Sequence, residues 1–179
     1  MRKHFISAAI AAAVALGAGA MAFASDDDSG SRRARARLTG FQENPSISTT
    51  GTGTLDLVID EKLETIKYEL TYGGLEGIAP FVTDGTVLFS HIHVAARGVN
   101  GGVSVFLCGG GGKPACPVPS GTVSGEIVPA DVVGPAGQGI NAGEETAFAE
   151  LVRAIRAGYT YVNVHTTRWP GGEIRGQIR

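Results

Sequence analysis

The sequence predicts an all-β domain, a Greek-key β-sandwich of about eight antiparallel strands with one short α-helix. Three observations support this fold class. Short runs of alternating apolar and polar residues recur along the chain, turn signals rich in glycine separate them, and a single segment has helical spacing instead. Most of the 27 glycines fall between the runs, where turns need positive φ angles.

The clearest strand is 65–72, in which Ile66, Tyr68, Leu70 and Tyr72 occupy every second position. Residues 54–59 show the same period, so the polar segment between the two runs predicts a hairpin turn. A first strand is expected to begin within Arg37 to Gly40. The other predicted strands are 86–95, 103–108, 121–128, 159–166 and 173–178.

One helix is predicted at 145–157. Four apolar residues within it recur at helical spacing, and Gly158 follows as a C-terminal stop. Asn141 and Glu144 have the spacing of a capping box just before it.

The N-terminus is typical of a secretory signal peptide over residues 1–24. Basic Arg2 and Lys3 precede an apolar run that is short for a membrane span, and Ala22 and Ala24 precede the expected cleavage site. We therefore expect a secreted or periplasmic protein with no membrane span after cleavage.

The expected mature chain is mildly acidic. The whole chain has 15 Lys and Arg against 17 Asp and Glu, and Arg2 and Lys3 are removed with the signal. This balance does not predict a nucleic-acid partner, which favours a strongly basic face. Residues 25–36 are predicted to be a disordered linker, and 37–179 the folded domain. The arginines of 32–37 are interpreted as solvated, with a site for anionic lipid or polysaccharide as the alternative.

Two cysteines, Cys108 and Cys116, flank a glycine-rich segment. In an oxidising compartment they are expected to form a disulfide that closes this short loop. A metal–thiolate pair is the alternative. No catalytic residues are predicted, because the chain has no Gly-x-Ser-x-Gly elbow and its cysteines are assigned to each other.

The candidate chemistry lies in three histidines. His91 and His93 stand two apart in a predicted strand, so their imidazoles share one face, opposite the apolar face that contains Ile92. His165 lies in another strand, on the same side as Asn163. If the two strands are neighbours, their polar side chains gather on one face.

The last two strands should pair with His165 opposite Glu173 and Asn163 opposite Arg175, since this register keeps like faces together. Two interpretations follow. In one, these residues form a hydrogen-bonded network that sets strand register. In the other, His91, His93 and His165 bind zinc or copper, with Glu173, Asn163 and Arg175 as outer hydrogen-bond partners and Glu173 accepting from His165.

Five segments together resemble the CHRD domain, the family named from chordin. They are Leu38-Thr39-Gly40-Phe41-Gln42-Glu43-Asn44-Pro45, Ser90-His91-Ile92-His93, Asn100-Gly101-Gly102-Val103, residues 157–166 with Tyr-Val-Asn-Val-His-Thr, and residues 170–177 with Gly-Gly-Glu-Ile-Arg-Gly-Gln. The resemblance runs in order from about Arg37 to Arg179. The family is found in bacterial exported proteins as well as in chordin.

The resemblance implies a non-enzymatic module, since the family is not known as an enzyme class. We therefore expect an exported binding or structural module of the cell envelope or extracellular space, with an extracellular or envelope protein or a polysaccharide as partner. The alternative is a copper- or zinc-binding protein that uses the three histidines.

Overall fold

The computed structural model describes residues 31–77 and 85–179, so the predicted signal peptide lies outside the described residues. Eight strands form one antiparallel sheet in the order β5-β4-β7-β8-β1-β2-β3-β6. The all-β class and the strand number are therefore confirmed. The strands are β1 (Ser31–Thr39), β2 (Thr52–Asp60), β3 (Thr65–Gly73), β4 (Val87–Val94), β5 (Gly102–Cys108), β6 (Gly121–Ile127), β7 (Thr160–Thr166) and β8 (Ile174–Gln177).

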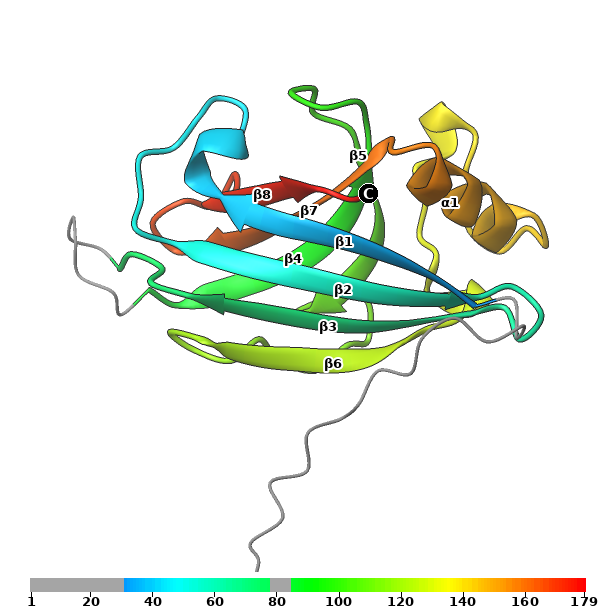
Figure 1. Ribbon diagram of the computed structural model, residues 1–179, viewed down its shortest axis with the longest axis horizontal. Helices are drawn as coiled ribbons and strands as arrows, with labels where there is room; N and C mark the ends of the chain where they lie inside the picture. Colours follow the sequence, from blue (N-terminus) through cyan, green and yellow to red (C-terminus); the bar gives the residue numbers. More distant parts are fainter. Residues whose placement is uncertain (1–30, 78–84) are drawn as a thin grey trace, which may run out of the picture.

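The sheet folds over on itself, so that two sets of strands face each other as the predicted sandwich requires. Figure 1 shows β1, β2, β3 and β6 in front, with β4, β5 and β7 behind them. The two layers are continuous through β8, and the sheet is nearly closed. Tyr68 on β3 donates a hydrogen bond to the carbonyl of Leu107 on β5 at 2.8 Å, which links one end of the strand order to the strand next to its other end.

The core fills the space between the layers. On β2 and β3 the alternate apolar residues from Leu55 to Ile59 and from Ile66 to Tyr72 are buried, while Lys67 and Glu69 are exposed. The predicted hairpin is confirmed, with Leu57 directly opposite Tyr68. From the other layer, Ile92, Val162 and Val164 point into the same core.

The disordered linker predicted for 25–36 is wrong from Ser31 onward. β1 begins there and pairs with β2 along nine residues, from Ser31 opposite Asp60 to Thr39 opposite Thr52. Ala34, Ala36 and Leu38 are buried in the core, and the arginines between them are exposed. Alternation with period two, rather than overall polarity, determines this segment's structure. Residues 25–30 lie outside the described residues.

The predicted helix is α1 (Ala147–Arg156), two residues shorter at its N-terminus than expected and one at its C-terminus. It buries Phe148, Leu151, Val152 and Ile155, and Gly158 follows with φ of +72°. The predicted capping box is not a helix cap. Asn141 does bond Glu144, at 3.2 Å, but that turn precedes the helix, whose N-cap Thr146 makes no side-chain bond. Three short 3-10 turns, Gly40–Gln42, Pro129–Asp131 and Ala136–Gln138, complete the fold.

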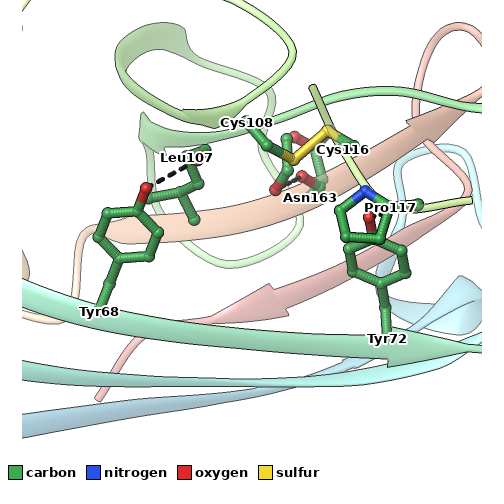
Figure 2. The surroundings of a disulfide bond; sticks show 8 residues. Tyr68, Tyr72, Leu107, Cys108, Cys116, Pro117 and Asn163 are labelled. Carbon is green, nitrogen blue, oxygen red and sulfur yellow. Dashed lines mark hydrogen bonds between the residues drawn. A yellow bond between two sulfur atoms is a disulfide. The ribbon is translucent and has the colours of Figure 1, made fainter. Parts of the chain in front are cut away.

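Cys108 and Cys116 form a disulfide, as predicted, at the end of β5. Figure 2 shows Tyr68 and Tyr72 reaching from β3 toward this segment, where Tyr72 donates to the carbonyl of Pro117 at 2.7 Å. Among the described residues, no helix is both long and apolar enough to cross a membrane.

Candidate metal centre

Neighbouring strands bring the three predicted histidines together. His91 and His93 lie on β4 and His165 on β7, and these strands are antiparallel neighbours. Asn163 is directly opposite His91, so His165 lies diagonally across from it on the same face. The predicted shared face is confirmed by the burial of Ile92 on the opposite side, within the core.

The three imidazoles are close and buried. The ring centroid of His91 lies 4.5 Å from that of His93 and 4.5 Å from that of His165. Their exposed fractions are 5%, 8% and 6% for His91, His93 and His165. One nitrogen from each ring can be chosen so that all three atoms lie within 4.8 Å of one another. Within the described part of the chain, these residues form the one such group of possible metal ligands.

Backbone carbonyls fix the tautomer of two rings. Nδ1 of His93 lies 2.8 Å from the carbonyl oxygen of Gly101, and Nδ1 of His165 lies 2.9 Å from that of Pro170. A carbonyl can only accept a hydrogen bond, so Nδ1 carries the proton in both rings. In the neutral form, Nε2 of each ring then presents a lone pair. This arrangement, with the far nitrogen held by an acceptor, is usual for histidines that bind metals.

Burial keeps all three rings neutral. Desolvation lowers the pKa of His91 to about 3 and that of His165 to about 4, and it also lowers the pKa of His93. The neighbouring imidazoles lower the pKa values of His91 and His165 further, because each would repel a second positive charge. Neutral imidazole is the form that binds a metal ion.

Each of the three rings has one nitrogen that is buried without a hydrogen-bond partner, and the Asn163 side chain is the polar neighbour of His91 and His93. Nδ1 of His91 and Nε2 of both His93 and His165 are buried and unpaired. Buried polar atoms in proteins are nearly always hydrogen-bonded, so three exceptions in one cluster need an explanation. A zinc ion with bonds of 2.0–2.1 Å would need nitrogens about 3.3 Å apart. The present separations are at most 4.8 Å, and the three residues supply neutral nitrogen ligands, so they could hold a metal ion.

Aromatic rings surround the cluster. Phe89 lies against both His91 and His165, with centroids 5.3 and 4.7 Å away, and Phe106 of β5 meets His91 edge-on at 5.1 Å. Tyr161 stacks on His93 at 4.6 Å. These rings limit access of water to the imidazoles and hold their orientations.

Asn163 and Arg175 lie where the sequence predicts, directly opposite each other on β7 and β8. Asn163 interacts with His91 and His93, and its Oδ1 is buried without a partner. Arg175 is buried, and its guanidinium lies 3.3 Å from the centroid of the Tyr161 ring. It donates to Oδ1 of Asn100 at 3.0 Å and to the carbonyl of Val99 at 2.7 Å, so it holds a loop beside the cluster.

The predicted bond between Glu173 and His165 is wrong. The Glu173 carboxylate instead accepts from Thr49 at 2.6 Å, from Thr166 at 2.7 Å and from the backbone N–H of Glu76 at 2.8 Å. Glu173 is fully buried, and a buried carboxylate takes the site with the most donors. It therefore holds the loop that precedes β2, and the carbonyl of Pro170 replaces it as the acceptor for His165.

Glu43 is a member of this region that the strand patterns missed. It lies just after the turn Gly40–Gln42, it is buried, and its Oε1 has no hydrogen-bond partner. Burial raises its pKa to about 7, although the Arg175 charge and the Asn163 side chain lower it in part. Gly172, with φ of +123°, leaves the space that Glu43 and Asn163 occupy. The one sequence signal for Glu43 is its place within a segment that resembles the CHRD domain.

The comparison with protein families identifies the domain. The family model of the CHRD domain matches residues 34–178. The chain belongs to the CHRD domain family. The CHRD match begins three residues before the predicted boundary at 37 and spans the strands that contain the histidine cluster. The chain matches no curated protein and no solved structure.

Proposed function

We propose that this chain is an exported, non-enzymatic CHRD module that binds a transition-metal ion, zinc or copper, through His91, His93 and His165. The observation that supports it most strongly is the group of three buried imidazoles, which can place one nitrogen each within 4.8 Å of one another and which each have an unpaired nitrogen. Neutral imidazoles suit both metals. The family is the reason to propose binding rather than turnover, because CHRD is a family of non-catalytic modules.

A hydrogen-bonded network without metal is the competing explanation, and the geometry favours it less. Such a network would need a donor for each lone pair. The protons on Nδ1 of His93 and His165 are already directed to Gly101 and Pro170, away from the cluster. The unpaired Nε2 atoms of His93 and His165 and the unpaired Oδ1 of Asn163 are acceptors, and the donors beside them are the single N–H of neutral His91 and the amide N–H₂ of Asn163. A cation is what a cluster of acceptors attracts.

Export is supported by two independent features. The first is the N-terminal sequence pattern at 1–24. The second is the disulfide between Cys108 and Cys116, a bond that persists in oxidising compartments. An extracellular or envelope location also suits a small β-domain with a disulfide at the end of one strand.

The test is the metal content of mature protein purified without a His-tag from the exported fraction. Elemental mass spectrometry should find about one equivalent of zinc or copper. His93→Ala and His165→Ala should each lose it, whereas Phe106→Leu, which changes the aromatic wall but removes no ligand atom, should retain it. The proposal fails if the parent is metal-free and takes up neither added Zn²⁺ nor added Cu²⁺.

A further inference from the structure

A second feature of the surface lies outside the histidine cluster. A groove of about 620 Å³ runs over β1, β2 and the segment after β8, and four arginines line it: Arg35, Arg37, Arg97 and Arg179. None of the three histidines lines it. Its volume is in the range typical of ligand clefts.

The fold brings these arginines together from three parts of the chain. Arg35 and Arg37 lie two apart on β1, so both point to the outer face. Arg179 is beside Arg35, because the two residues exchange backbone hydrogen bonds of 2.7 and 2.8 Å. Arg97 enters from the loop after β4. The alternation that places alanines in the core therefore also builds the basic groove.

The positive charge of the groove is largely uncompensated. Asp56 pairs with Arg35, Nε to Oδ1, at 2.8 Å. Within the described residues, the side chains of Arg37, Arg97 and Arg179 have no ion pair or hydrogen bond. Guanidinium groups present planar pairs of donors that match carboxylates. Three of them that share one cavity mark a place for an anion with more than one charge.

A smaller cavity of about 310 Å³ extends the groove. It shares Gln42, Arg97 and Gln177 with the first, and Phe41, whose side chain is 71% exposed, lies on its lining. The extended groove thus combines separated cations, amide groups and an exposed aromatic ring, and at its smaller end it reaches Glu43 and Arg175 beside the histidine cluster. Amides bond sugar hydroxyls, and an aromatic ring packs on the apolar face of a sugar.

We propose that this groove binds an acidic polysaccharide whose charges are carboxylates, as in chains of uronic acids. A concave groove lined by separated arginines accepts a chain with a charge on successive sugars, whereas a flat bilayer surface cannot enter it. Nucleic acid is disfavoured because acids outnumber bases in the chain, 17 to 15. The location of such a ligand outside the cell rests on the export proposed above, but the binding itself depends on neither export nor metal.

The experiment is calorimetric titration of the purified full-length mature protein with a short oligogalacturonate, at low and at physiological salt. Arg37→Glu and Arg97→Glu should each weaken binding about tenfold or more, since each replaces a charged hydrogen bond with repulsion. Lys62→Glu makes the same charge change at an exposed turn outside the groove and should leave binding unchanged. A neutral maltooligosaccharide should not bind.

Three results would overturn the proposal. The first is no binding of oligogalacturonate at low salt by a protein that melts normally. The second is an equal loss with Lys62→Glu, which would indicate unspecific attraction. The third is binding to anionic lipid vesicles without binding to the sugar. Melting curves of the two arginine variants identify any that fail to fold, and Arg97→Gln then replaces Arg97→Glu. Metal content is measured on the same samples, so failure of this site and failure of the metal site are distinguishable.

Discussion

The outer faces of the two layers have similar polar sequences and opposite environments. On β1 and β3 the outward residues, such as Arg35 and Lys67, are exposed. On β4 and β7 the outward residues, such as His91, His165 and Asn163, are buried. Strand alternation distributes side chains between two faces in the same way in both layers. What differs is whether loops cover the outer face.

Three loops cover the histidine face. The loop that contains Glu43 is tied to the loop after β4, since Asn100 donates to the carbonyl of Asn44 at 3.0 Å. The loop between β7 and β8 supplies the carbonyl of Pro170 to His165. Burial under these loops lowers the pKa values of His91 and His165 by desolvation.

The largest test of this difference compares two arginines. Arg175→Ala should lower the free energy of unfolding by about 3–5 kcal/mol, because it leaves buried partners unpaired. Arg35→Ala, on the exposed face, should cost at most about 1 kcal/mol. Urea denaturation of both variants measures the difference. Arg175→Met keeps much of the packing and should fall between them; equal losses for Arg175→Ala and Arg35→Ala would mean that the cover does not desolvate the histidine face.

The sequence predicts the histidine face better than its cover. Alternation placed His91, His93, His165 and Arg175 on one side, since period two determines face once strands are known. It did not predict the partners of Glu173. That residue precedes β8, and its carboxylate accepts hydrogen bonds from Thr49 and Thr166. Thr166 ends β7, but Thr49 and the backbone N–H of Glu76 lie in loops, whose residues show no periodic pattern.

The same reasoning explains the missed strand and the missed acid. The segment before Arg37 has the composition of a linker, yet Ala34 and Ala36 fill narrow core positions beside Leu38. Alanine is only weakly apolar, so the alternation of Ala34 and Ala36 with arginines is a weak strand pattern, and the polar composition of the segment favours a linker. Glu43 belongs to no periodic element, and its burial arises from the fold of a loop over β7 and β8. The burial of Glu43 is therefore seen only in the three-dimensional structure.

The second test concerns pH in the metal-free protein. The folded-state pKa values of His91 and His165, about 3 and about 4, lie below the unfolded value of 6.5. Their contribution to stability is therefore complete above pH 6.5 and is lost as pH falls toward these values. Each of these two histidines should lower the free energy of unfolding by about 2 kcal/mol as the pH falls from about 7.5 to about 5.

Glu43 changes stability with pH in the opposite direction to the histidines. Its carboxyl group must therefore be removed before the effect of the histidines can be measured. Its folded-state pKa of about 7 lies above 4.5, so its contribution is present below pH 4.5 and is lost as pH rises through 7. We therefore measure unfolding of Glu43→Gln, with and without His165→Gln, in the presence of a chelator. His165→Gln should reduce the pH slope. An unchanged slope would show that the His165 imidazole is solvated.

The third test concerns the disulfide between Cys108, at the end of β5, and Cys116. Replacement of both Cys108 and Cys116 by serine should lower the free energy of unfolding by about 2.5 kcal/mol, the value expected for so short a loop. Metal content should not change, because Cys108 and Cys116 pack in the hydrophobic core with Ile92, whereas the histidines lie on the other face of the sheet. Thermal melting and elemental analysis of one double variant check both statements. Loss of metal would show that the disulfide stabilises the histidine site as well as the core.

The smallest expected effect is on the uncovered face. The pair of Arg35 and Asp56 is short, but the two side chains are 74% and 48% exposed. A double-mutant cycle with Arg35→Ala and Asp56→Ala should give a coupling free energy of about 0.2–1 kcal/mol that declines with added salt. A coupling near that of a buried pair would mean that something covers this face in solution. An acidic chain in the groove would do so, and titration with oligogalacturonate during the cycle would then change the coupling, because a bound carboxylate competes with Asp56 for Arg35.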